Sequence, residues 1–278
     1  MTASPIPPPA QDMPAAGHAT PAAAGAALEC VEVCVRVPGR LLIENLTVRL
    51  AAGRIVVVLG RNGAGKSSLL HTLAGLNPHA SGTVLVDGRS LDEWPRRELA
   101  RRVALLPQAS DDPFPGTTLE TVLVGRHPHI GFWRWEDAHD REVAQRSLAA
   151  TDLAGCDERE VDTLSGGERR RLAIAAVLAQ EPVVFLLDEP IQQLDPHHQV
   201  ETLKLFRAEA DRGRLVIRSL HDVGLAARYA DDAILLHGDG RWLYGPAATV
   251  LNEQELGALY GTRIRELRWA DGRTFVAV

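Results

Sequence analysis

The chain has 278 residues, of which 45% are hydrophobic and 24% charged, and its formal net charge is −6. This length suffices for one large hydrophobic core or two small ones. The acidic balance argues against nucleic acid as the main partner, because such proteins usually carry a basic excess. No apolar run reaches the roughly 18 residues that a bilayer-spanning helix needs.

The N-terminal residues 1–27 are rich in Ala and Pro and contain no basic residue and no continuous apolar stretch. They do not resemble a secretory signal, and we expect a disordered extension. The three cysteines, Cys30, Cys34 and Cys156, form no CxxC pair, which favours buried thiols in a reducing compartment. Cys30 and Cys34 lie in an alternating stretch, which predicts that they share one face of a strand.

From residue 28 onwards, strand and helix patterns alternate along the chain. Apolar runs predict strands over 28–37, 41–50, 53–60, 82–88, 103–108, 182–190, 214–222 and 232–240. Helical patterns follow several of these, at 66–75, 94–102, 195–213 and 223–230, and a tail from about 246 alternates short helix with strand. This order predicts a mostly parallel sheet with crossover helices.

Strand patterns disappear between about 109 and 165, which indicates a helical insertion within an α/β domain. Two helices are expected, over 117–129 and 135–155. Trp133 and Trp135 precede or begin the second one. They either form the rim of a docking surface for a partner helix or pack inside the insertion, and the second interpretation is favoured.

The segment GRNGAGKSS at 60–68 fits the pattern G-x-x-x-x-G-K-[ST] between an apolar strand and a helix. Its glycines let backbone N–H groups surround a phosphate at a helix N-terminus. Lys66 can reach the β- and γ-phosphates of a nucleotide, and Ser67 can offer its hydroxyl to Mg²⁺. A glycine turn without a ligand is the alternative, and the flanking strand and helix argue against it.

Two adjacent acids, Asp188 and Glu189, end the apolar segment VVFLLDEP. Burying two carboxylates is unfavourable unless something compensates them, and Mg²⁺ bound to a nucleotide would do so. Asp188 would then hold the metal through a water, and Glu189 would face the γ-phosphate as the base that orients water. An acidic pair that caps a loop is the alternative, and the phosphate loop makes it less favourable.

The segment LSGGE at 164–168 is a second element suited to phosphate, since two glycines and Ser165 precede a helix. One domain cannot easily use two such elements on one phosphate group. We therefore expect the second element to serve a nucleotide held by another copy of the chain. The strand at 214–222 ends in His221 and Asp222, which alone would suggest a helix N-cap beside an incidental histidine.

The phosphate loop, LPQ, LSGGE, LLDEP, LD at 194–195 and LHD stand in an order that resembles the ATP-binding cassette (ABC) ATPase family. The resemblance covers roughly residues 28–250. It implies a P-loop NTPase of the α/β class, with a RecA-like mostly parallel sheet, flanking helices, an antiparallel β region and an inserted helical subdomain at about 109–165. Residues 251–278 would be a C-terminal tail packed on this domain.

The same resemblance implies a head-to-tail homodimer that holds two ATP molecules between the phosphate loop of one subunit and LSGGE of the other. Catalysis would fall to Glu189, to His221 at the γ-phosphate and to Gln108 near the water. Asp195 would lie in the loop that passes between subunits. Magnesium would be held by Ser67, Gln108 and Asp188. ATP would be bound by Gly60, Arg61, Asn62, Gly63, Ala64, Gly65, Lys66, Ser67 and Ser68. The partner's ATP would meet Leu164, Ser165, Gly166, Gly167 and Glu168.

Two departures from the family pattern stand out. The aromatic residue that usually stacks on adenine is absent, and Val37 or Arg36 stands near its place in VCVRVPGR. Ile191 and Gln192 follow the carboxylates where small or polar residues are usual. Ile191 would either disturb dimer closure or simply pack, and slower hydrolysis is one expected consequence.

A single cassette without a fused membrane segment is similar to the ATPase subunits of bacterial importers. GRHPH at 125–129 and LYG at 259–261 resemble the branch that serves ferric siderophores, haem and cobalamin, with haem ranked behind the other two. Such a subunit would work at the cytoplasmic face of the inner membrane, with a permease and, indirectly, a periplasmic binding protein. The alternatives are a soluble ABC factor acting on DNA or ribosomes, and a weakly active regulatory cassette.

Overall fold

The computed structural model describes residues 26–77, 81–108, 116–131, 134–270 and 272–278. The predicted N-terminal extension falls on residues 1–27, of which 1–25 lie outside this part of the chain. Ala26 and Ala27 already belong to the first strand, and the side chain of Ala27 is buried. The first described strand thus begins two residues earlier than the sequence pattern predicted.

A six-stranded sheet in the order β10-β9-β3-β8-β7-β6 forms the centre of the molecule. Its strands are β3 (Ile55–Gly60), β6 (Val103–Leu106), β7 (Val184–Leu187), β8 (Leu215–Ser219), β9 (Asp232–Leu236) and β10 (Trp242–Pro246). Five strands are parallel, and β10, which the sequence analysis did not predict, joins β9 in antiparallel fashion. All residues of β3, β7, β8 and β9 are buried, as expected when both faces of a parallel sheet are covered.

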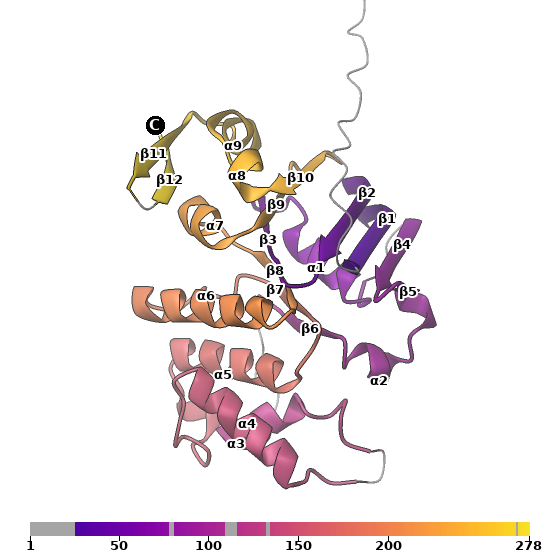
Figure 1. Ribbon diagram of the computed structural model, residues 1–278, viewed down its shortest axis with the longest axis vertical. Coiled ribbons are helices and arrows are strands. Elements are labelled where there is room, and N and C mark those ends of the chain that lie inside the picture. Colours follow the sequence, from indigo (N-terminus) through magenta and orange to yellow (C-terminus); the bar gives the residue numbers. More distant parts are fainter. Residues whose placement is uncertain (1–25, 78–80, 109–115, 132–133, 271) are drawn as a thin grey trace, which may run out of the picture.

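A second, antiparallel sheet covers one face of this core, on the right in Figure 1. It contains β1 (Ala26–Val37), β2 (Arg40–Ala51), β4 (Ser81–Val86) and β5 (Arg89–Ser90). The register of β1 against β2 shifts between Cys30 and Val33, and Cys30 and Val33 both point into the core. Cys34 lies on the other face, with its Sγ 3.3 Å from the side-chain oxygen of Asn45. The prediction that Cys30 and Cys34 share a face is therefore wrong, because the bulge reverses the alternation.

The helices lie on both faces of the central sheet and below it in Figure 1. They are α1 (Lys66–Leu73), α2 (Arg96–Leu99), α3 (Thr118–Val124), α4 (Ala138–Ala150), α5 (Gly166–Ala179), α6 (Pro196–Asp211), α7 (Val223–Tyr229), α8 (Ala247–Val250) and α9 (Glu253–Tyr260), with short 3₁₀ turns η1 (Leu91–Glu93) and η2 (Val161–Thr163). None of the helices in the described part of the chain combines the length and the apolar content needed to cross a membrane.

The helices α3, α4 and α5 pack on one another and enclose their own apolar cluster, which contains Val122, Leu148 and Leu172. Arg126, which follows α3, joins the three helices from inside. Its side chain is 4% exposed, and it lies 2.9 Å from Asp140 on α4 and 2.8 Å from Glu181, just beyond α5. This group of helices lies between β6 and β7 in the sequence, so it is an insertion between two neighbouring parallel strands of the central sheet.

The last residues pack back onto the domain. α9 contributes Leu256 and Leu259 to a cluster that also contains Leu59 of β3. The hairpin of β11 (Ile264–Trp269) and β12 (Gly272–Ala277) adds Ile264 and Phe275 to it, and β12 contacts α7. The C-terminal segment therefore shares a core with the strand that precedes the phosphate loop.

Candidate nucleotide-binding site

The glycine-rich loop that joins β3 to α1 has the backbone shape that phosphate binding requires. Gly63 and Gly65 have φ angles of 75° and 105°, in the left-handed region that only glycine adopts readily. A Cβ added at Gly60 would lie 2.6 Å from the carbonyl oxygen of Leu236 on β9. Larger residues would therefore strain these turns. The helix α1 begins directly after the loop, and no side chain caps it, so the backbone N–H groups of its first turn are available to a phosphate.

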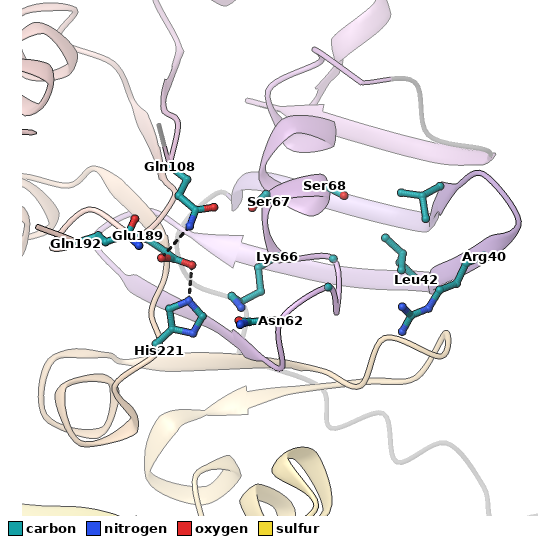
Figure 2. Close-up of a pocket in the computed structure, with 13 residues that line it drawn as sticks. Arg40, Leu42, Asn62, Lys66, Ser67, Ser68, Gln108, Glu189, Gln192 and His221 are labelled. Carbon is teal, nitrogen blue, oxygen red and sulfur yellow. Dashed lines mark hydrogen bonds and ion pairs between the residues drawn. The ribbon is translucent and has the colours of Figure 1, made fainter. Parts of the chain in front are cut away.

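Lys66 extends along this loop towards the end of the site where Glu189 and His221 lie (Figure 2). Its side chain is buried, and its Nζ donates a hydrogen bond of 3.0 Å to the carbonyl oxygen of Gly60. Burial lowers the pKa of Lys66, and the negative charges of Glu189 and Asp188 oppose that shift. A phosphate would offer this ammonium a charged acceptor, which makes a stronger bond than a carbonyl does.

Two buried carboxylates, Asp188 and Glu189, follow the end of β7 and are 1% and 6% exposed. Ser219 of the neighbouring strand β8 holds both in place. Its hydroxyl donates to Asp188 over 2.6 Å and accepts from the backbone N–H of Glu189 over 2.9 Å. Glu189 has a φ of 49°, a conformation that is rare outside glycine and is kept only where the surroundings fix it. Sequence reasoning did not identify Ser219, because only strand pairing brings it here.

The three side chains predicted to be catalytic meet at this edge of the sheet (Figure 2). His221 Nε2 lies 2.5 Å from one carboxylate oxygen of Glu189, and Gln108 Nε2 donates to the other over 3.2 Å. Gln108, Glu189 and His221 follow β6, β7 and β8, which are consecutive parallel strands. Their convergence follows from the rule that ligand sites of such sheets lie beyond the carboxyl ends of the strands.

These residues line one open cavity of about 620 Å³ that also includes the phosphate loop. Its walls are formed by Val37, Arg40, Leu42, Asn62, Gly63, Gly65, Lys66, Ser67, Ser68, Gln108, Glu189, Gln192 and His221. Gly60, Arg61, Ala64 and Asp188 were also predicted to belong to the site, and they are not among the residues that line the cavity. Arg40 and Leu42 were missed by the sequence analysis, which named Val37 or Arg36.

The donors predicted to bind magnesium suit that ion. Ser67 offers a hydroxyl oxygen and Asp188 a carboxylate, and Gln108 uses its amide nitrogen on Glu189, which leaves its amide oxygen available. Mg²⁺ prefers such oxygen ligands and commonly shares its coordination with substrate phosphates. Within the described residues, no group of three or more His, Cys, Asp or Glu side chains could hold a metal on its own, so the phosphates would have to complete this site.

The LSGGE segment forms the start of α5 and lies apart from this cavity. Ser165 caps the helix: its hydroxyl accepts from the N–H of Glu168, and the Glu168 carboxylate accepts from the N–H of Ser165. Those backbone and side-chain bonds, with Arg159, lower the pKa of Glu168 to about 2. None of the predicted residues Leu164, Ser165, Gly166, Gly167 and Glu168 is among the cavity's lining residues.

Asp195 is the N-cap residue of α6, where its carboxylate accepts from the backbone N–H of His198 over 2.9 Å. Like LSGGE, it lies outside the cavity. The single chain thus presents the phosphate loop together with the side chains predicted to be catalytic, and it presents LSGGE and Asp195 elsewhere.

The structure distinguishes the two interpretations of Ile191. Its side chain is 8% exposed and packs in the same apolar cluster as Leu59 and Leu220. It therefore acts as a core residue in this chain, while the neighbouring Gln192 lines the nucleotide cavity.

Trp135 contradicts the favoured prediction of core packing for the helical insertion. It is 88% exposed, beside a hollow of about 310 Å³ lined by Glu120, Leu123, Val124, His127, Ile130, Arg134, Trp135 and Glu136. A tryptophan this exposed contributes little to folding. Trp133 lies outside the described residues.

Comparison with known proteins shows which family and which relatives this chain is similar to. Residues 43–192 match the family model described as ABC transporter. The hemin import ATP-binding protein of Pseudomonas entomophila is 44% identical over 79% of this chain and 87% of its own length. The petrobactin import ATP-binding protein of Bacillus anthracis is 35% identical over 82% and 84%. A solved metal-chelate type ABC transporter in an inward-facing conformation is 28% identical, with a TM-score of 0.80 over 91% of this chain and 98% of that one.

Proposed function

This chain belongs to the ABC transporter family of ATPases, and from that premise we propose that two copies of it hydrolyse ATP head to tail to drive a bacterial importer of an iron chelate. The observation that carries the proposal is the convergence of Gln108, Glu189 and His221 on one cavity with Lys66. The subunit would lie at the cytoplasmic face of the inner membrane, bound to a permease that a periplasmic binding protein supplies with cargo.

In this proposal each side chain has a distinct task. Lys66 and the loop N–H groups bind the β- and γ-phosphates, and the carboxylate of Glu189 orients the attacking water and accepts its proton. His221 lies against Glu189 and contacts the γ-phosphate, so its position differs between bound ATP and ADP. Ser67, Gln108 and Asp188 would hold magnesium, which neutralises charge that develops on the phosphates.

Replacing Glu189 by Gln tests the hydrolytic role. The change keeps the shape of the side chain and its hydrogen bond from Gln108 but removes the base. We expect turnover to fall by about 10²- to 10⁴-fold, the usual contribution of a general base, while Mg-ATP still binds with a Kd close to that of the wild type. Equal turnover in wild type and variant would contradict hydrolysis at this site and favour a regulatory cassette.

The hollow beside Trp135 supports the permease partnership. An exposed aromatic side chain, an exposed Val124 and flanking charges have the composition of an interface anchor with a polar rim. We expect Trp135→Ala to leave the basal turnover of the isolated chain unchanged and to abolish its stimulation in vesicles by the permease with loaded binding protein. A Trp135→Ala complex that is stimulated as strongly as the wild type would contradict this assignment.

Iron-bearing cargo is favoured by the names of the similar proteins, which import hemin or petrobactin. This moves haem ahead of cobalamin, which the sequence resemblance had ranked higher. Vesicles that contain the complex test this ranking of cargoes. Binding protein loaded with hemin is expected to raise ATP turnover. If ATP turnover rises with cobalamin and not with hemin, cobalamin is the better-supported cargo. No feature of the residues that the structure describes favours the soluble-factor alternative.

A further inference from the structure

Arg170, on the second turn of α5, occupies a position that the assigned machinery does not explain. It is only 5% exposed. All three of its guanidinium nitrogens donate to main-chain carbonyl oxygens, and no side-chain carboxylate is among its hydrogen-bond acceptors in the described residues. The acceptors and distances are Pro107 (2.8 Å), Gln108 (3.3 Å), Asp188 (2.6 Å), Glu189 (2.8 Å) and Pro190 (3.3 Å).

These five carbonyls belong to two short segments that both carry catalytic side chains. Pro107 and Gln108 follow β6, and Asp188 to Pro190 follow the adjacent parallel strand β7. The planar guanidinium lies between the two segments and bonds to the backbone of each. On the cavity side, Gln108 and Glu189 are joined by a single contact of 3.2 Å. Arg170 therefore fixes the distance between the backbones of Gln108 and Glu189, whose side chains are in contact.

The five carbonyl oxygens around residue 170 match the hydrogen-bonding geometry of an arginine side chain. Five donors in a rigid, planar group can meet carbonyls on two segments, whereas the point charge of lysine cannot. Burial lowers the pKa of Arg170, and the negative charges of Asp188 and Glu189 raise it, but a guanidinium remains charged in either case. The cation also offsets the two adjacent buried carboxylates. Its loss would leave buried carbonyls without donors, which is unfavourable.

We propose that Arg170 is a positioning residue for ATP hydrolysis, which sets the separation of Gln108 and Glu189 and ties both to the helix that begins with LSGGE. Ser165 caps α5 and Arg170 lies in its second turn. A displacement of the helix start by a partner's nucleotide would therefore be carried to the backbone of the segments that hold Gln108 and Glu189. This inference rests on the proposed function, since it assigns a task within that reaction.

Arg171, the next residue of α5, provides a matched control. Its guanidinium also donates to main-chain carbonyls, those of Thr151 and Asp152, and forms an ion pair with the Asp152 carboxylate. It thus ties α5 to the two residues that follow α4, whereas Arg170 ties the same helix to the segments after β6 and β7. Arg171→Gln removes a comparable set of bonds from the same helix, so it reports the structural effect of losing an anchoring arginine.

The experiment compares Arg170→Gln with Arg171→Gln for kcat, KM for ATP and thermal unfolding. Since misplacement of reacting groups by about 1 Å can cost about 100-fold in rate, we expect Arg170→Gln to lower kcat by about 10- to 100-fold. Its KM and its affinity for Mg-ATP should stay within about threefold, because the phosphate loop is untouched. Arg171→Gln should keep its kcat per folded molecule even where it lowers the Tm.

A second readout separates positioning from general destabilisation. In a Gln108→Ala background the Arg170→Gln change should have little further effect on kcat, because both act on one pair of residues and such effects are not additive. The Arg171→Gln change should act independently of Gln108→Ala. If Arg170→Gln does not fold, Arg170→Lys serves instead, with a smaller expected fall because the charge remains.

Several results would overturn the proposal. The first two are an unchanged kcat in Arg170→Gln and an equal fall in kcat in Arg170→Gln and Arg171→Gln. The others are fully additive effects of Arg170→Gln and Gln108→Ala on kcat, and failure of both Arg170 variants to fold, which would show a purely structural role. Turnover of the wild type no higher than that of Glu189→Gln would instead contradict the proposed function, and this inference with it. An active wild type beside an unaffected Arg170→Gln would contradict the positioning role alone.

Discussion

Three non-aromatic side chains, Val37, Arg40 and Leu42, line the cavity. Figure 2 shows Arg40 and Leu42 at the end opposite Glu189. The Arg40 guanidinium is held by the carbonyl oxygen of Gly238, with its Nε at 2.9 Å. Val37 is 37% exposed, so its face is open to a ligand. A base placed here would meet aliphatic and guanidinium surfaces and no aromatic ring.

An aromatic side chain at position 37 should therefore tighten nucleotide binding. Stacking on a base is worth about 1–3 kcal/mol, so Val37→Tyr is expected to lower the Kd for Mg-ATP by about fivefold or more. Titration of the Glu189→Gln protein, which binds without turnover, measures this directly. Val37→Ile is the control that adds bulk without a ring. If the Tyr variant binds no more tightly than the Ile variant, the base does not lie against residue 37.

At the scale of residues, the sequence indicated cavity-lining side chains where each stands inside a contiguous motif. Lys66 and Glu189 followed from a strand, a turn and a helix in a recognisable order, His221 followed only from the family resemblance, and all three line the cavity. Ser219 and Arg170 were missed because tertiary structure alone creates their importance. Ser219 reaches Glu189 through strand pairing, and Arg170 reaches it across the interface between α5 and the sheet.

The start of α6 is linked to the helical insertion through His198. One ring nitrogen lies 2.8 Å from the Asp195 carboxylate and the other 3.3 Å from that of Asp152, which also pairs with Arg171. A neutral imidazole has one N–H, so only the imidazolium donates to both carboxylates at once. The hydrogen bonds to Asp195 and Asp152 raise the pKa of His198, as expected for a cation between two acids.

This link predicts a pH dependence of stability. Because the folded pKa of His198 is raised above its ordinary value of 6.5, the stabilisation is complete below that value and is lost as the pH rises through the higher, folded one. The Tm of the wild type minus that of His198→Gln should therefore be largest near pH 6 and shrink towards pH 9. His197→Gln, next in sequence and exposed, should behave as the wild type does. A difference that is constant with pH would contradict the link.

At the scale of elements, the periodic segments were predictable and their irregularities were not. The buried strands β3, β7 and β8 follow from short apolar runs, and α5 follows from the helical pattern after LSGGE. The two glycines were expected before the helix, whereas Ser165 caps it and Gly166 and Gly167 are its first residues. The bulge in β1 left no sequence signal, so Cys34 was placed on the wrong face. Trp135 was assigned to a core because composition cannot show that no neighbour covers it.

At the scale of the whole molecule, the two elements predicted to bind phosphate lie in different places on the chain. The phosphate loop shares a cavity with the side chains predicted to be catalytic, whereas Ser165, Gly166 and Gly167 stand at the start of α5 and are not among the lining residues of that cavity. The helix start offers free N–H groups and the positive end of a dipole, which favour phosphate. A second copy, turned head to tail, would place this helix start over the nucleotide of the first.

Mixing two complementary variants tests this arrangement most directly. Both carry Glu189→Gln to prevent turnover; one also carries Lys66→Ala and the other Ser165→Arg. In a head-to-tail dimer each double variant alone has two defective sites, whereas the mixed pair has one intact site formed by Lys66 of one chain and Ser165 of the other. With Mg-ATP, sedimentation should show dimers for Glu189→Gln and for the mixture, and single chains of 30.1 kDa for either double variant alone. A mixture that stays monomeric while Glu189→Gln dimerises would contradict the account.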